Sequence, residues 1–107
     1  MKGPLGQIMR QAQQAQEAMK RAQDEIARTE ITGESGGGMV KITLNGKHEA
    51  KKVEIAADAL QESKDFLEDL VAAAINDASQ KLERNASEKM AKVAGGLNLP
   101  AGFNLGG

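Results

Sequence analysis

A chain of 107 residues with a net charge of −1, two phenylalanines and neither tryptophan nor tyrosine can form one small domain with an aromatic-poor core. Cysteine is absent, which excludes disulfides, thiol chemistry and thiolate metal sites and fits a reducing cytosol. The sequence has no apolar run of membrane-spanning length and no apolar signal core, so we expect a soluble, cytoplasmic protein without a membrane partner. We expect oligomerisation to supply additional stability.

The charged side chains are distributed unevenly along the chain. Residues 1–21 carry four basic side chains and one acidic one, and residues 80–107 carry four basic and two acidic ones. The part between them carries six basic and twelve acidic side chains. Both ends are therefore basic and the centre is acidic, an asymmetry that the net charge conceals.

The first predicted element is a long helix from Pro4 to about Arg28. Proline suits the first turn of a helix, and the residues that follow are mainly strong helix formers. Apolar side chains recur at alternating spacings of three and four residues, which places them on one narrow seam. The seam consists of Leu5, Ile8, Ala12, Ala15, Met19, Ala22 and Ile26. Because it is rich in alanine, we expect a second helix to cover it at close range.

Three short antiparallel strands are predicted next. The first covers about Thr29–Thr32 and leads into a flexible, glycine-rich turn at Gly33–Gly38. Apolar residues alternate with others over residues 39–44, which is the period of a half-buried strand. The pair Asn45-Gly46 predicts a type I′ hairpin turn. A return strand follows, with Val53 and Ile55 on one face, and one face of the sheet must be covered.

A second long helix closes the predicted fold. Asp58 is expected to cap a short helical turn, and Ser63 to cap the long helix, which ends at Gly95-Gly96. Its apolar face is broad near the sheet and then narrows to a stripe. The face comprises Phe66, Leu67, Leu70, Val71, Ala74, Ile75 and Ala78, and the stripe Leu82, Ala86, Met90 and Val93. We predict an α+β fold ordered α-β-β-β-α, with a single domain over residues 1–96 and an irregular, flexible tail over residues 97–107.

The order of the elements has a consequence for the charges. If the two long helices pair antiparallel, the two basic ends of the chain meet far from the sheet. A twofold dimer then presents two basic tips, and double-stranded DNA is the expected polyanion, held through phosphate contacts that do not read sequence. A merely solvated helix surface is the competing interpretation, because pairs such as Asp77–Lys81 and Glu88–Lys92 account for several of the charges locally.

Few residues offer catalytic chemistry. His48 is the only histidine, and the glycine-rich segment lacks the Gly-Lys-Ser/Thr of a P-loop. We therefore predict a non-enzymatic protein with no cofactor, no metal and no small-molecule substrate. The alternative to DNA binding is a protein-interaction scaffold that docks partner helices on the alanine-rich seam or through the apolar tail. Binding of RNA or single-stranded DNA is a weaker option, because Trp and Tyr are missing and Phe66 is expected to be buried.

Several stretches of the sequence are familiar together. They are Met9–Gln16, Thr32–Gly36, Val53–Ile55, Leu67–Ala78 and Leu99–Phe103. With them the chain resembles, over nearly its whole length, the YbaB/EbfC family of bacterial nucleoid-associated proteins. The resemblance implies an α-β-β-β-α subunit and a homodimer joined largely through its central part, with projecting helical arms. It also implies DNA binding and a role in nucleoid organisation or gene expression.

The resemblance further implies that the distal parts of the arms contact DNA. The matching positions are Lys2, Arg10, Lys20 and Arg21 in the first helix, and Lys81, Arg84, Lys89 and Lys92 in the second. One departure from the family pattern is the number of alanines along the first helix, where bulkier residues are expected. We expect this departure to make the arms more flexible.

Overall fold

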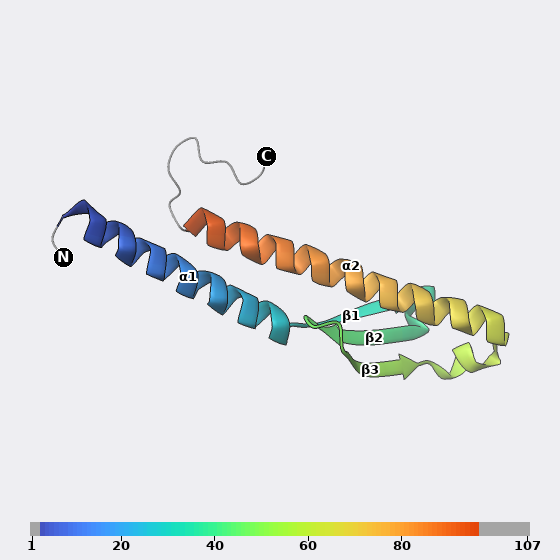
Figure 1. Cartoon of the computed structure of the whole chain (residues 1–107). Helices are drawn as coiled ribbons and strands as arrows, with labels where there is room; N and C mark the ends of the chain where they lie inside the picture. The colour runs from blue at the N-terminus through green and yellow to red at the C-terminus, as the bar shows by residue number, and fades with distance from the viewer. Residues whose placement is uncertain (1–2, 97–107) are drawn as a thin grey trace.

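The computed structural model describes residues 3–96 and shows the predicted α-β-β-β-α order (Figure 1). The long elements are α1 (Pro4–Arg28), β1 (Glu30–Ser35), β2 (Val40–Asn45), β3 (Ala50–Ile55) and α2 (Lys64–Gly96), with short 3-10 turns η1 (Gly36–Gly38) and η2 (Ala57–Gln61). The molecule is elongated, with extents of 72 × 26 × 15 Å. The predicted tail over residues 97–107 lies outside the described residues.

The three strands form one antiparallel sheet in the order β1-β2-β3. Strand β2 is central, and its residues Val40, Ile42 and Leu44 all point toward α2 and are buried. Val40 and Ile42 pair with Ile55 and Val53 of β3. The strand alternation in the sequence therefore identified the face that carries the core.

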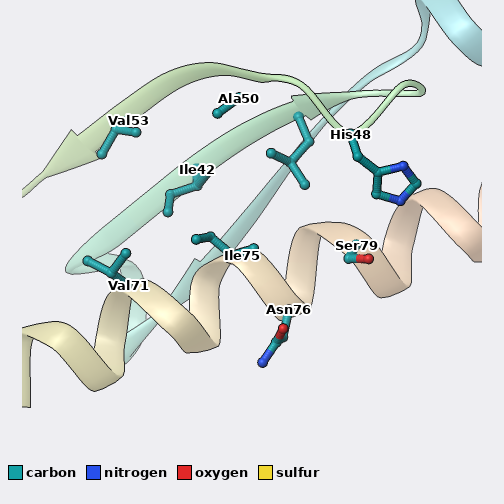
Figure 2. Close-up of a pocket in the computed structure, with 9 residues that line it drawn as sticks. Ile42, His48, Ala50, Val53, Val71, Ile75, Asn76 and Ser79 are labelled. Atoms are coloured by element: carbon teal, nitrogen blue, oxygen red, sulfur yellow. The ribbon is translucent and has the colours of Figure 1, made fainter.

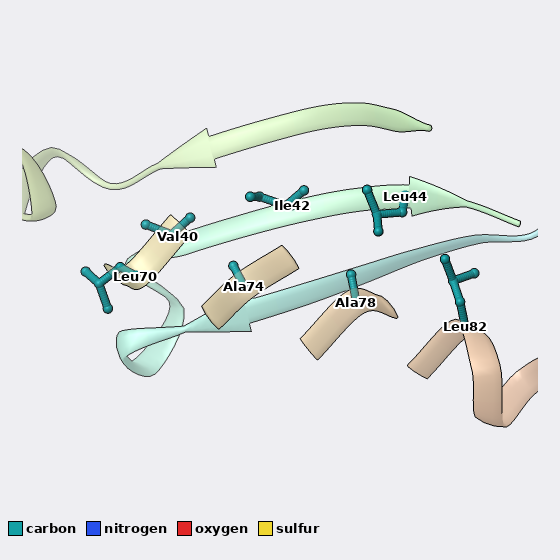
Figure 3. Packing of buried hydrophobic residues seen from close by; sticks show 7 residues of the cluster. All are labelled: Val40, Ile42, Leu44, Leu70, Ala74, Ala78 and Leu82. Atoms are coloured by element: carbon teal, nitrogen blue, oxygen red, sulfur yellow. The ribbon is translucent and has the colours of Figure 1, made fainter. Parts of the chain in front are cut away.

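Helix α2 supplies the other half of the core. Leu70, Ala74, Ala78 and Leu82 follow one another at intervals of four residues and are all buried against the sheet (Figure 3). The two central alanines let the helix approach the strands closely, and a leucine at each end fills the wider space. The predicted apolar face of the second helix is confirmed at these positions.

The first strand extends further than the sequence analysis predicted. It runs to Ser35, so Gly33 lies within the strand and not in a turn, and only Gly36–Gly38 form the turn. Gly33 pairs with Ile42 on the face toward α2, and it is buried. A Cβ at this position would overlap the backbone of α2 at Ala74 and Ala78. The close approach of helix and strand thus requires a glycine here. Rules for turns consider only neighbouring residues, so they do not predict this requirement.

The hairpin between β2 and β3 also differs from the prediction, because it is not a type I′ turn. Within the loop only His48 has a positive φ, of 64°, and Gly46 does not. The buried side chain of Asn45 organises the loop, since its Oδ1 accepts the N–H groups of Lys47 at 2.9 Å and Glu49 at 3.0 Å. A Cβ on Gly46 would overlap the carbonyl oxygen of Ile26, so this glycine serves the packing of the loop on the end of α1.

The start of α2 has the predicted cap, whereas η2 does not. The hydroxyl of Ser63 accepts the N–H of Phe66 at 3.1 Å, as an N-cap does. Asp58 lies inside η2, after Ala56 at the cap position, and that turn has no side-chain cap. The prediction for Asp58 was wrong, because the cap position of this turn is two residues earlier, at Ala56.

Strand β3 is exposed along its whole length in the single chain. Val53 and Ile55 share the α2 side of the sheet, as predicted, yet they are 55% and 40% exposed. Helix α2 packs on β1 and β2. A helix is ~10 Å wide and strands are ~4.8 Å apart, so one helix covers about two strands. Phe66, near the start of α2, is 45% exposed, so the expectation that it is buried was wrong.

Beyond the sheet, α1 and α2 run side by side in opposite directions, and the free ends of both helices lie at the same end of the molecule (Figure 1). Ala22 of the predicted seam is buried, at 5% exposure. No helix within residues 3–96 combines the length and the apolar character needed to cross a membrane.

We predict that Gly33→Ala lowers the free energy of unfolding by about 1–3 kcal/mol, because the added methyl group forces β1 and α2 apart. The matched control is Gly95→Ala, where an added Cβ meets no atom and a helical alanine is favourable. Urea unfolding followed by circular dichroism measures both. Equal midpoints for the wild type and Gly33→Ala would contradict the close-packing account.

Candidate nucleic-acid interface

Lys81 is held where α2 passes over β1. Its Nζ forms a 2.9 Å ion pair with Oδ2 of Asp77 and lies 3.5 Å from the carbonyl oxygen of Thr32. The same oxygen of Asp77 accepts the backbone N–H of Glu34 at 2.9 Å. The hydrogen bond from Lys81, followed by that from Glu34, lowers the pKa of Asp77 below its ordinary value. This cluster clamps α2 to the edge strand, so Lys81 lies beside the sheet and not at the arm tip.

Lys89 lies at the junction between α1 and β1. Its Nζ is 3.3 Å from Oγ1 of Thr29, the residue that follows the last turn of α1. The hydroxyl of Thr29 in turn donates to the carbonyl oxygen of Glu25 at 2.7 Å. Lys89 therefore links α2 to the end of α1 that adjoins the sheet, and it too lies away from the tip.

Arg84 and Lys92 have a different setting, because both are exposed. Helical residues turn by about 100° each, so Arg84 lies on nearly the opposite side of α2 from buried Leu82. Lys92 lies on the flank of the helix, about 100° from half-buried Val93. Within residues 3–96 neither side chain forms an ion pair. These two cations of α2 are available to a ligand.

The cations Arg10, Lys20 and Arg21 of α1 lie off the side that packs on α2. Arg10 and Arg21 are eleven residues apart, about three turns, and therefore share one side of the helix. That side is about 100–120° from Ala22, whose side chain is buried. Arg10, Lys20 and Arg21 are exposed, and none pairs with an acid within the described part of the chain.

Arg28 extends this row and was missed in the sequence analysis, which assigned it to the acidic centre. It lies seven residues after Arg21 on the same side of α1, and it is exposed. The spacing of Arg10, Arg21 and Arg28, which places all three on one side of the helix, is the sequence signal that could have identified it. The row spans about 27 Å along the helix axis, from a rise of ~1.5 Å per residue.

The predicted tip is therefore only partly assembled from the predicted residues. The ends of the two helices do lie together, far from the sheet (Figure 1). Arg10 and Lys92 are the described members of the predicted set nearest to those ends, whereas Lys81 and Lys89 lie near the sheet. Lys2 lies outside the described residues.

A second surface feature is an open groove of about 370 Å³ between β3 and α2 (Figure 2). Its walls are mainly apolar and include Ile42, Val53, Val71 and Ile75, and His48 lies at one end. Within residues 3–96, no three histidine, cysteine or acidic side chains gather in a way that would hold a metal ion. The groove offers apolar surface and little chemistry.

Comparison with known proteins bears on the role of these surfaces. A model of the YbaB/EbfC DNA-binding family matches residues 1–97. The chain belongs to the YbaB/EbfC DNA-binding family. Its fold resembles the crystal structure of the uncharacterized protein HP0035 from Helicobacter pylori, with a TM-score of 0.67, 22% sequence identity, and coverage of 87% of this chain and 99% of that chain.

Membership of YbaB/EbfC, a family of DNA-binding, nucleoid-associated proteins, bears out the resemblance seen in the sequence. In this YbaB/EbfC chain the candidate cations fall into two groups. Lys81 and Lys89 take part in contacts within the subunit. Arg10, Lys20, Arg21, Arg28, Arg84 and Lys92 project from the arms.

We predict that Asp77→Asn destabilises the protein at neutral pH, because Lys81 loses its carboxylate partner. Folding lowers the pKa of Asp77, so its contribution is present above the ordinary aspartate pKa and is lost as the pH falls through the lower, folded value. Thermal unfolding at a series of pH values should show the wild type and the variant converging in acid. The control is Glu83→Gln on the same helix, and a difference for Asp77→Asn that is constant with pH would contradict the role assigned to the carboxylate.

Proposed function

We propose that this protein is a homodimeric, nucleoid-associated protein of the cytoplasm that binds double-stranded DNA through the phosphate backbone. Its helical arms make the contacts, and the protein organises the nucleoid or adjusts gene expression. The single observation that supports this most directly is the set of exposed arm cations that have no acidic partner among the described residues.

The spacing of the arm cations suits a polyanion more than a compact ligand. The row of Arg10, Arg21 and Arg28 extends over about 27 Å of one side of α1. Duplex DNA presents a phosphate every ~3.4 Å along each strand, so a row of this length spans several phosphates. No residue of α1 between Pro4 and Gln16 is acidic. The distal arm thus combines positive charge with amide side chains, a suitable composition for contacts with phosphate and sugar.

A second copy of the chain is the partner that we propose for the uncovered apolar face. Val53 and Ile55 of β3 and Ile75 of α2 are each at least 40% exposed, and Val53 and Ile75 line the groove. A domain of this size buries a limited fraction of its surface, so a large exposed apolar face is unfavourable in an isolated chain. Pairing of two such faces by a twofold axis would cover both and direct two pairs of arms outward.

The competing scaffold function has less support from the structure. One of its proposed docking surfaces was the alanine-rich seam of the first helix. The proximal part of that seam is already engaged within the subunit, since Ala22 is buried and Ile26 is half-buried where α2 packs on α1. A partner helix would have to displace α2 at these positions.

We predict that glutamine at four arm positions weakens binding to duplex DNA of any sequence and reduces the salt dependence. The positions are Arg10, Arg21, Arg84 and Lys92. Each lost phosphate contact lowers the slope of log affinity against log salt by ~0.9. Fluorescence anisotropy at several salt concentrations measures both quantities. The matched control changes four exposed lysines outside the arms, Lys41, Lys47, Lys51 and Lys64, to glutamine. An equal loss in both variants would refute the assignment to the arms.

We also predict that Val53→Glu or Ile75→Glu weakens the homodimer, because each buries a charge in the proposed interface. Loss of a central interface residue costs ~2 kcal/mol or more, which is at least a thirtyfold change in the dissociation constant. Sedimentation velocity over a range of concentrations measures it. Ile8→Glu is the control, since Ile8 is at least as exposed as Val53 and Ile75 but lies on the arm. An unchanged dimer in both groove variants would place the interface elsewhere.

A further inference from the structure

The distal end of α1 carries an uncovered apolar face. Leu5, Ile8 and Met9 are 56%, 59% and 52% exposed, although Leu5 and Ile8 belong to the same seam as the buried Ala22. Figure 1 shows the reason, because α1 extends past the end of α2. The side of α1 that α2 covers near the sheet is therefore continuous with a side that nothing covers among the described residues. We call Leu5, Ile8, Met9 and Ala12 the distal face.

The segment that follows α2 begins at the point where α2 ceases to cover α1. Helix α2 is described to Gly96, and residues 97–107 follow it outside the described part. This segment has no charged side chain and contains four large apolar ones. They are Leu97, Leu99, Phe103 and Leu105. Its composition matches an apolar surface and does not match DNA, which is a polyanion.

The length of the segment is sufficient for the distance. Eleven extended residues reach up to ~36 Å. The part of α1 from Ala15 back to Leu5 is about 15 Å long, at a rise of ~1.5 Å per residue. A segment attached at Gly96 therefore has enough chain to cross to α1 and follow the distal face to its end.

We propose that residues 97–107 of the same chain pack along the distal face of α1. Attachment to α2 makes this docking intramolecular, which raises the effective concentration of the segment above that of any second copy in dilute solution. Arg10 is about 100° around the helix from Met9, so the docked segment leaves this cation exposed. The segment continues the apolar cover of α1 beyond the end of α2 and joins the free ends of the two arm helices.

The composition of the chain provides a sharp test. It contains only two phenylalanines, Phe66 and Phe103, and Phe66 lies at the sheet end of the molecule. A nuclear Overhauser effect from a phenylalanine ring can therefore be assigned to one of two residues. Methyl-labelled methionine makes Met9 observable by NMR in the full-length protein. We expect nuclear Overhauser effects from an aromatic ring to the Met9 methyl group, and we expect them to persist in Phe66→Leu and disappear in Phe103→Leu.

Tail variants provide the second measurement. Leu99→Ser with Phe103→Ser should shift the Met9 methyl resonance, whereas Asn98→Ser with Asn104→Ser, the matched polar control, should not. Met39 packs on the core and reports that each variant is folded. The proposal fails if Met9 does not respond to the apolar variant. It also fails if the Overhauser effects occur only between chains in a mixture of Met-labelled and Phe-labelled protein, which would identify a second copy as the occupant.

Discussion

Helix α2 lies so close to β1 that the strand has room only for a glycine at position 33. On the helix, the small side chains of Ala74 and Ala78 permit the same close contact, and both are fully buried. This contact places α2 over β1 and β2, and the edge strand is held in the same position by hydrogen bonds from the N–H of Glu34 to Asp77 and from Lys81 to the carbonyl oxygen of Thr32. The direction in which the helix leaves the sheet, and hence the position of its arm, depends on this one approach.

The same approach explains which surfaces remain open. A helix seated over β1 and β2 leaves β3 without cover, so Val53 and Ile55 face solvent on the core side of the sheet. An apolar strand edge of this kind is unfavourable in isolation, and it lies at the opposite end of the molecule from the arm tips. Assembly and ligand contact can therefore take place on separate surfaces without competing for residues.

The basic residues also divide by position. Lys81 and Lys89 form contacts that stabilise the root of the arm pair, and the exposed arginines and lysines project from its sides. A basic residue on an amphipathic helix can serve either purpose, because a long side chain reaches a carbonyl or hydroxyl group as readily as solvent. The charge of the arms is thus partly used in contacts within the subunit and partly exposed to solvent.

Much of the fold follows from local pattern. The spacing of apolar residues in α1 and α2, the alternation in β2 and the cap at Ser63 depend on neighbours a few residues away, and the sequence alone determined them. The basic character of the two chain ends was equally visible. Only the tertiary structure decided that Gly33 belongs to a strand, that Gly46 packs on α1, that β3 lacks cover, and that Lys81 and Lys89 bond to β1 and Thr29. Each of these depends on groups more than ten residues away in the chain, and the distance between such groups is set by packing, which no short-range pattern encodes.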